Sequence, residues 1–555
     1  MKYVIGLDFG SLSGRAVLVE AGTGREVACA VEDYSHGVMS DALPDGTPLP
    51  HDYALQHPQD YLDVLAKTVP RVLREASVAP EDVAGVGLDF TACTLLPVDA
   101  SLTPLCCRPE YASRPNAYVK LWKHHAAQPY ADRLNAVAGM RGEAFLPLYG
   151  GKISCEWAIP KIWQILEEDE PLYREVHRFF EAGDWVVSWL CGKESHSRPF
   201  AGYKAIYTDA GYPSPSFFEA LDPRLKDIAG TRLSASLSEL GTPAGGLCGR
   251  AAELTGLCRG TPVAVANIDA HAAMPAVGAC NCGTMLMIMG TSTCHIMNGE
   301  VRRPVPGMCG VVKGGAVPGR YGYEAGQSCV GDLFAWFTEH CVPSAYRNEA
   351  EARGENLHAL LRRKAGRLRP GESGLLALDW WNGNRSVLVD ADLGGMVLGL
   401  TLATRPEEIY RALIEATAFG TRVIIEAFGE SGLPVERLIA SGGIARKDPL
   451  MMQIYADVTG REIRIAGSAQ SPALGSAIFA ACAAGLYPDV QAASAVMGRL
   501  DARIYRPDPA NTGIYSLLYR EYKTLHDYFG RGENDVMKRL RALRSRLTQE
   551  RTATE

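Results

Sequence analysis

The sequence predicts an α/β fold of two related domains with mixed sheets. Residues 4–20 and 284–298 each consist of an apolar run, a turn rich in Gly, Ser or Thr, and a second apolar run, which is typical of a β-hairpin. The two hairpins head the two halves of a 555-residue chain, which exceeds the size of about 250–300 residues at which a single core stops growing. We therefore expect domains at residues 1–283 and 284–540, and a charged tail at 541–555.

Strands and helices alternate between the two hairpins. Residues 61–76 have apolar positions at helical spacing, with Pro70 predicted to kink the helix. Residues 83–90 and 262–269 are continuous apolar runs of the length of a buried strand. This alternation of strands with helices favours the α/β class.

The second half continues the same pattern. Residues 407–432 predict a long amphipathic helix that ends at Gly432, and residues 438–443 predict a strand that enters a glycine turn before a helix at 448–460. Residues 471–485 are small and apolar, so we expect a buried helix close to a sheet. From about Arg520 we expect a charged helix that is either a solvated cap or a dimer contact.

The composition excludes several classes of protein. Hydrophobic residues make up 47% and charged residues 21%, and the net charge of −7 argues against non-specific binding to nucleic acid. Asp8 and Arg15 interrupt the apolar start, so no secretory signal is predicted, and no apolar run is long enough to cross a membrane. The 15 cysteines lack paired C-x-x-C spacing, so we expect free thiols in a cytoplasmic protein, largely buried.

The two hairpin turns are candidate phosphate-binding sites. Asp8 ends the first strand before Gly10 and Ser11, and its carboxylate can hold Mg²⁺ while small residues let backbone N–H groups approach a phosphate. Gly290 and Thr291 occupy the matching turn of the second hairpin. Each turn alone is more often a plain polar turn, but the pair predicts a clamp for a polyphosphate between the domains.

Two further loops complete the candidate site. Gly442 and Gly443 end a strand, where bare backbone can accept a flat base, although an ordinary turn explains them equally well. Neither a G-x-x-x-x-G-K-[ST] nor a well-placed G-x-G-x-x-G motif is present. Asp269 ends the predicted strand at 262–269, where a carboxylate can take the proton of an attacking hydroxyl. His271 is a rival base, for which a structural role is favoured.

Taken together, these stretches resemble the FGGY carbohydrate kinases of the actin-like superfamily, from the first hairpin to about Gly485. Further stretches are similar to those of the family members that phosphorylate ribulose: residues 86–99, 116–128, 150–157, 181–192, 201–207, 289–295, 306–315, 321–328 and 378–386. One departure is Leu12, where many relatives carry an acidic residue. It affects the details of the first turn and leaves the role of Asp8 intact.

The resemblance implies two RNase H-like domains with the active site in the cleft between them. It implies ATP-dependent phosphorylation of the 5-hydroxyl of L-ribulose, with MgATP and a small sugar as partners, no nucleic acid or membrane, and a homodimer. It implies Asp269 as catalytic base, Asp8 near Mg²⁺, and the nucleotide beside the glycine turns that contain Gly290, Thr291, Gly442 and Gly443. It implies a sugar pocket lined by Ala92, Lys204, Asp269 and Glu324.

Several alternatives remain open at this stage. The motifs equally fit a kinase of D-ribulose, D-xylulose or ribitol, and less well an actin-like ATPase or a sugar-sensing protein without activity. Lys204 and Glu324 read in isolation as an ion pair between domains or at the surface. Asp89 is a candidate for a supporting role near Ala92. The large aromatic residues Trp122, Trp380 and Trp381 are assigned to the core.

Overall fold

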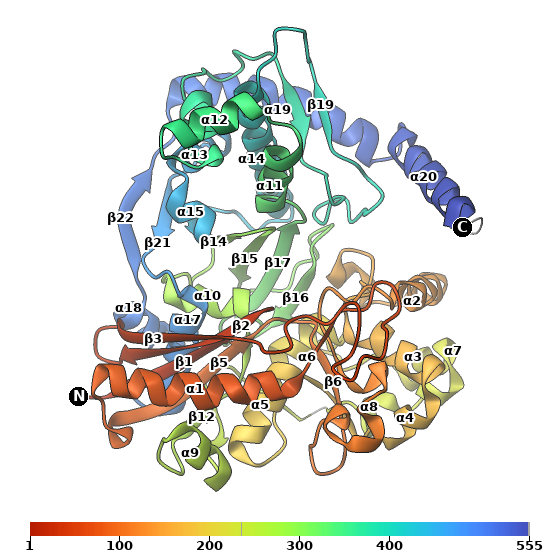
Figure 1. Ribbon diagram of the computed structural model, residues 1–555, viewed down its shortest axis with the longest axis vertical. Coiled ribbons are helices and arrows are strands. Elements are labelled where there is room, and N and C mark those ends of the chain that lie inside the picture. Colours follow the sequence, from red (N-terminus) through yellow and green to blue (C-terminus); the bar gives the residue numbers. More distant parts are fainter. Residues whose placement is uncertain (235, 553–555) are drawn as a thin grey trace.

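Two seven-stranded mixed sheets form the centre of the computed structural model, which describes residues 1–234 and 236–552 (Figure 1). The α/β class with mixed sheets is therefore confirmed. One sheet is built from strands before residue 284 and the other from strands after residue 283. The predicted tail at 541–555 is described as far as Thr552, and residues 553–555 lie outside the described part.

The first sheet has the order β11-β12-β5-β1-β2-β3, with β13 also paired to β5. Its strands are β1 (Tyr3–Phe9), β2 (Ser13–Glu20), β3 (Arg25–Asp33), β5 (Val83–Phe90), β11 (Pro243–Gly246), β12 (Pro262–Ala264) and β13 (Asn267–Ile268). The helices of this half are α1 (Pro58–Ala76), α2 (Gln128–Arg141), α3 (Ala158–Glu168), α4 (Glu170–Glu175), α5 (Ala182–Cys191), α6 (Arg198–Lys204), α7 (Pro215–Leu221), α8 (Ile228–Thr231), α9 (Gly249–Thr255) and α10 (Asp269–Ala276).

The second sheet has the order β16-β17-β15-β14-β20-β21-β22. Its strands are β14 (Thr284–Met289), β15 (Thr293–Gly299), β16 (Gly310–Lys313), β17 (Tyr321–Gln327), β20 (Arg437–Ser441), β21 (Ile463–Ala466) and β22 (Leu500–Tyr505). The helices of this half are α11 (Gly331–His340), α12 (Ser344–Ala352), α13 (Leu357–Ala365), α14 (Pro406–Glu430), α15 (Gly443–Lys447), α16 (Pro449–Thr459), α17 (Ser471–Ala483), α18 (Val490–Met497), α19 (Pro509–Gly530) and α20 (Val536–Thr552).

Three smaller sheets and several single turns of 3-10 helix complete the described chain. The sheets are β4 (Leu55–Gln56) with β7 (Val119–Lys120), β6 (Leu95–Val98) and β8 (Arg178–Glu181); β9 (His196–Ser197) with β10 (Leu237–Ser238); and β18 (Leu376–Leu378) with β19 (Met396–Leu398). The 3-10 turns are Pro80–Asp82, Leu105–Cys107, Pro109–Tyr111, Pro115–Ala117, Leu146–Tyr149 and Pro223–Leu225.

Both predicted hairpins are confirmed, and each has the same neighbour arrangement. β1 pairs antiparallel with β2 and parallel with β5, and β14 pairs antiparallel with β15 and parallel with β20. In each sheet the hairpin turn therefore lies beside the carboxyl end of a parallel strand. Ligands of open α/β sheets bind outside such strand ends.

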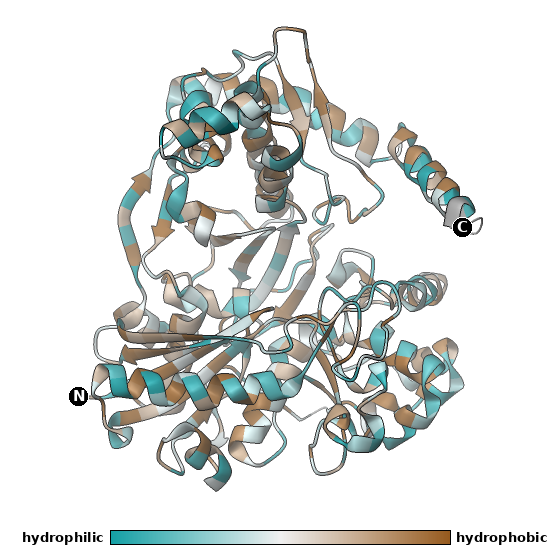
Figure 2. Cartoon of the chain, viewed as in Figure 1, coloured by the Kyte–Doolittle hydropathy of each residue, from teal (hydrophilic) through white to brown (hydrophobic). Residues whose placement is uncertain are grey.

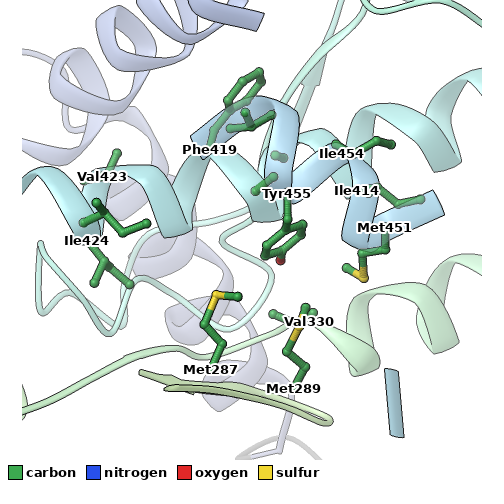
Figure 3. Packing of buried hydrophobic residues seen from close by; sticks show 14 of the residues in the cluster. Met287, Met289, Val330, Ile414, Phe419, Val423, Ile424, Met451, Ile454 and Tyr455 are labelled. Atoms are coloured by element: carbon green, nitrogen blue, oxygen red, sulfur yellow. The ribbon is translucent and has the colours of Figure 1, made fainter. Parts of the chain in front are cut away.

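The core of the second half fixes the position of β14. Figure 3 shows Met287 and Met289 of β14 pointing towards side chains of α14 and α16, among them Phe419 and Tyr455. Met287, Met289 and Tyr455 are fully buried. Because the strand is anchored by this packing, the turn that follows at Gly290 starts from a rigid base.

The strongest departure from a simple division into halves is α17. Although it belongs to the last quarter of the chain, it packs on β1 and β5 of the first sheet and against α10 (Figure 1). The contact is close: a Cβ atom at Gly475 would lie 1.6 Å from the Ala272 carbonyl oxygen, and one at Gly6 would lie 1.8 Å from the Ala473 carbonyl oxygen. The predicted buried helix at 471–485 is confirmed as α17. Glycines stand where its backbone meets the backbone of α10 and of β1.

The C-terminal region differs from its prediction. The helix expected from about Arg520 starts earlier, at Pro509, because Tyr515, Tyr519 and Tyr522 bury their rings in the core of the second half. α20 follows and extends away from the body (Figure 1). Figure 2 shows that hydrophilic and hydrophobic residues alternate along it, whereas the strands of the first sheet are largely hydrophobic.

Two expectations about the chain as a whole can be compared with the described residues. No helix in this part of the chain is long and apolar enough to cross a membrane. All 15 cysteines are free thiols, and only five of them are buried: Cys93, Cys106, Cys155, Cys280 and Cys329. The expectation of free thiols is therefore confirmed, while the expectation that they are largely buried is wrong.

Gly475→Ala tests the helix contact. We expect it to lower the free energy of unfolding by about 1–3 kcal/mol or more, because the added methyl group meets backbone that cannot move aside. The matched control is Gly429→Ala in α14, where a Cβ atom would meet nothing within 4 Å. That control should stabilise by about 0.5–1 kcal/mol. Urea unfolding measures both, and equal stability of the two variants would contradict the proposed crowding.

Candidate functional site

Asp8 and Asp89 form a pair of buried carboxyl groups at the end of the first sheet. They are direct neighbours in the parallel register of β1 and β5, and they are 9% and 0% exposed. Burial raises the pKa of Asp8, opposed by Arg15, whose Nε lies 3.3 Å from Asp8 Oδ2. Burial and the negative charge of Asp8 raise the pKa of Asp89 well above its ordinary value. The two groups therefore resist being ionised together, and a bound cation would favour the doubly ionised pair.

The oxygen atoms of this pair suit a hard divalent cation. Asp89 Oδ2 accepts a hydrogen bond of 2.6 Å from Ser476, while Asp89 Oδ1 has no hydrogen-bond partner. In the described residues no group of three or more His, Cys, Asp or Glu side chains is arranged to hold a metal ion. Mg²⁺ is commonly bound by one or two carboxylates together with substrate phosphates and water. The residues present fit that mode of binding.

Asp269 lies next to this pair, at the start of a helix rather than at the end of a strand. The predicted strand at 262–269 divides into β12 and β13, and Asp269 is the first residue of α10. Its Oδ1 accepts a hydrogen bond of 2.7 Å from the Ala270 N–H. The pKa of Asp269 is raised to about 7. Burial is the main cause, the Ala270 N–H and the charge of Lys204 lower the pKa, and the negative charges of Asp8 and Glu324 raise it. A carboxyl group with this pKa can take up a proton near neutral pH.

Lys204 and Glu324 form a buried ion pair that joins the two halves. Lys204 ends α6, Glu324 lies on β17, each is 4% exposed, and Lys204 Nζ lies 3.1 Å from Glu324 Oε2. Arg385 contacts the other oxygen, Glu324 Oε1. Burial alone would raise the pKa of Glu324, but Lys204 and Arg385 outweigh it and hold the pKa at about 2. Glu324 therefore stays ionised throughout the neutral range.

His271 is close to the same pair and is neutral. It is fully buried on α10, its ring centroid lies 4.4 Å from that of Tyr203, and its Nε2 lies 3.7 Å from Glu324 Oε2. Burial lowers the pKa of His271 to about 4. A histidine that is already neutral at pH 7 and binds protons this weakly is a poorer general base there than Asp269.

Ala92 lies on a turn directly after β5. The turn runs from Thr91 to Thr94, and Thr94 Oγ1 donates to the Thr91 carbonyl oxygen at 2.7 Å. Burial raises the pKa of the neighbouring Cys93 thiol, and Lys204 is the cation that most strongly opposes this increase. The turn with Ala92 is therefore close to Lys204, as the expected sugar pocket requires.

The first glycine turn is held by residues from other segments. The Gly10 N–H donates to the Ser13 carbonyl oxygen at 3.0 Å, and the Ser11 carbonyl oxygen accepts from Gln56 Nε2 at 2.8 Å. Trp122 Nε1 donates to Ser11 Oγ at 3.0 Å. Trp122 therefore contacts the candidate site, contrary to its assignment to the core, whereas Trp380 is buried in the core as expected.

The glycine turns of the second sheet lie side by side. Gly290 follows β14 and Gly442 follows β20, its parallel neighbour. Gly442 has φ of +97°, and a Cβ atom there would lie 2.3 Å from the Met289 carbonyl oxygen, so only glycine fits. Gly290, Thr291 and Gly443 are exposed, although both backbone groups of Gly290 are bonded to neighbouring residues, Ser292 and Gly331.

The described residues bring most of the candidate site together. Contacts or mutual effects on pKa link six of its residues: Asp8, Asp89, Asp269, Lys204, Glu324 and Arg385. Thr291 is connected to them less directly, through α10, which contacts β15 after the second turn. Arg385 was missed in the sequence, although residues 378–386 were singled out, because a charge reveals its partner only in three dimensions.

Comparison with known proteins places the chain in a family. The FGGY family of carbohydrate kinases, C-terminal domain, matches residues 285–484. The chain is 57% identical over 540 residues to a ribulokinase of Bacillus licheniformis, covering 96% of this chain and 98% of that protein. It is 56% identical over 550 residues to a ribulokinase of Halalkalibacterium halodurans, covering 98% of each.

The fold agrees with this assignment. A ligand-bound xylulose kinase from Lactobacillus acidophilus superposes with a TM-score of 0.77 at 16% identity, covering 96% of this chain and 99% of that one. Together with the identity to curated relatives over nearly the full length, this agreement defines the class of protein. The chain belongs to the FGGY family of carbohydrate kinases and, within that family, to the ribulokinases.

Asp269→Asn tests the electrostatic cost of this site. Because the pKa of Asp269 is raised from 3.8 to about 7 on folding, the folded state binds this proton more tightly than the unfolded state. The carboxyl group therefore lowers stability as pH rises from about 4 to about 7, and the full cost is present above pH 7. We expect the asparagine variant to have the higher Tm at pH 8, with a difference that shrinks towards pH 4.

Thermal unfolding of both proteins without ligands, at pH 4 to 8, measures this difference. Asp209→Asn, which replaces an exposed aspartate paired with Arg302 across the halves, serves as the control for loss of one carboxylate as such. A difference in Tm between the Asp269→Asn variant and the wild type that does not change with pH would contradict the raised pKa.

Proposed function

We propose that the chain transfers the γ-phosphoryl group of MgATP to the 5-hydroxyl of L-ribulose, with Asp269 as the base. The observation that carries this proposal is the Lys204–Glu324 ion pair, which joins the halves next to Asp269. Several donors and acceptors converge there, as recognition of a sugar with many hydroxyl groups requires. The curated relatives named ribulokinase support ribulose as the acceptor.

Each residue has a distinct part in the proposed mechanism. Lys204 donates to a sugar hydroxyl, and Glu324, which stays ionised, accepts from another. Asp269 takes the proton of the attacking hydroxyl as the bond to phosphorus forms and the bond to the leaving ADP breaks. Positioning and neutralisation of charge dominate phosphoryl transfer, so one oriented base is enough.

The nucleotide is proposed to lie against the glycine turns. The turns with Gly10, Ser11, Gly290 and Thr291 approach the phosphates through the N–H groups of Ser11 and Thr291, because those of Gly10 and Gly290 donate within their own turns. Gly442 with Gly443 lies beside the nucleoside. Asp8 would hold Mg²⁺, supported by the unpartnered oxygen of Asp89, and the ion when bound would supply positive charge against that of the transferred group.

A coupled assay of ADP release over several sugars tests the acceptor. L-ribulose should give the highest kcat/KM, above D-ribulose, D-xylulose, ribitol and glycerol. A higher value for any of these would replace the proposed acceptor, and ADP release at full rate without sugar would support an ATPase instead. The assignment to the cytoplasm and a homodimer remains part of this proposal.

Asp269→Asn should abolish turnover while nucleotide binding persists. The amide keeps the shape of the side chain but cannot accept the proton, so we expect kcat to fall by about 10²–10⁴-fold. The Kd for MgATP, measured by calorimetry, should change little because Asp269 faces the sugar.

In the wild type, kcat/KM should fall as pH decreases through about 7, since the base must be ionised. Turnover close to the wild-type rate would exclude Asp269 as the base.

Lys204→Met should raise the KM for L-ribulose far more than the KM for ATP, because it removes a donor that only the sugar uses. The matched control is Asp209→Asn, which breaks the Asp209–Arg302 pair of 3.4 Å that also joins the halves. The control should leave both KM values near those of the wild type. Equal increases in both KM values for Lys204→Met would contradict the sugar pocket.

A further inference from the structure

The turn that carries Ala92 has an unfavourable backbone. Cys93 has φ of +61°, in the left-handed region that non-glycine residues seldom adopt. Such a conformation persists only where the surroundings hold it, and it is enriched at functional sites. Ala92 has no polar side-chain atom, so any contact it makes with a sugar depends on where this backbone lies.

One side of the turn is held by a buried lysine. Lys161 of α3 is fully buried, and its Nζ donates to the Cys93 carbonyl oxygen at 2.7 Å. The same ammonium group donates to the carbonyl oxygens of Leu121 and Lys120 at 2.9 and 3.2 Å. No carboxylate contacts it among the described residues. A buried ammonium group without an ionic partner is costly, and these three carbonyl oxygens are the acceptors that hold it in place.

The other side of the turn is held by a buried glutamate. Glu181 ends β8, is 8% exposed, and its Oε2 accepts a hydrogen bond of 2.8 Å from the Thr94 N–H. Burial raises the pKa of Glu181 to about 7, while the Thr94 N–H and the charge of Lys161 lower it. Lys161 and Glu181 thus hold the two polar groups of one peptide unit, the Cys93 carbonyl oxygen and the Thr94 N–H.

We infer that Lys161 and Glu181 are positioning residues that set the affinity for sugar by fixing the Thr91–Thr94 turn. The inference rests on the proposed function, in which Ala92 lines the sugar pocket. Neither residue touches the reacting atoms. We assign their effect on the sugar to the backbone of Ala92 and Cys93, which is next to Lys204.

Lys161→Met is the primary test. It keeps the length of the side chain and removes the three hydrogen bonds to carbonyl oxygens. We expect the KM for L-ribulose to rise about tenfold, the KM for MgATP to stay within about twofold, and kcat to change little, as loss of uniform binding predicts. The Tm should fall as well, because three buried carbonyl oxygens lose their donor, but that loss alone would not raise one KM and spare the other.

Lys120→Met is the matched control. Lys120 is equally buried, but its Nζ lies over the Tyr53 ring at 4.7 Å and 3.4 Å from His124 Nε2, and among the described residues it makes no hydrogen bond to the turn. Both KM values should stay near those of the wild type. If Lys161→Met and Lys120→Met have the same effect on the two KM values, loss of buried charge in general explains it and the inference is overturned.

Glu181 provides an independent pair of variants should Lys161→Met fail to fold. Glu181→Gln retains an oxygen that can accept from the Thr94 N–H and should keep the wild-type KM for L-ribulose. Glu181→Leu removes the acceptor and should raise that KM selectively. Equal values for the two variants would overturn the inference. If the wild type itself does not phosphorylate L-ribulose, the proposed function fails instead, so the two failures are distinguishable.

Discussion

The structure depends on the contact between α10 and α17, where two backbones meet without side chains between them. Gly475 lies against Ala272, and Gly6 and Gly87 let α17 approach the first sheet equally closely. Because interiors are packed as densely as crystals, a contact of this kind permits no adjustment by a side chain. It also determines where α10 begins, and hence where Asp269 lies relative to Asp8.

The charges around the site shift the pKa values of two nearby carboxyl groups, Glu324 and Asp269, in opposite directions. Glu324 lies between Lys204 and Arg385 and stays ionised, whereas Asp269 lies near other negative charges and holds a proton up to about pH 7. Environments that separate the pKa values of nearby groups mark the division of tasks in active sites. A fixed acceptor and a proton-accepting base thus arise from the same kind of side chain.

Much of the architecture was predictable from local chemistry. The two hairpins carry turn residues between apolar strands, and the small residues at 471–485 indicated a tightly packed helix. The strand expected at 262–269 was wrong at its end, since apolar composition does not distinguish a strand from the first turn of a helix. Arg385 and Lys161 could not be recognised, because their partners, Glu324 and the Cys93 carbonyl oxygen, lie far away in sequence.

The position of α17 also constrains the order in which the chain can fold. Residues 471–483 cover a face of β1 and β5, and Arg15 and Glu26 of the first hairpin region contact Gln470 and Ser468. Domains usually fold one after another as the chain emerges during synthesis. Here apolar residues of the first sheet, among them Val4 and Val17, lack the cover of α17 until residue 483 has been made, so the nascent first half exposes surface that is buried only late in synthesis.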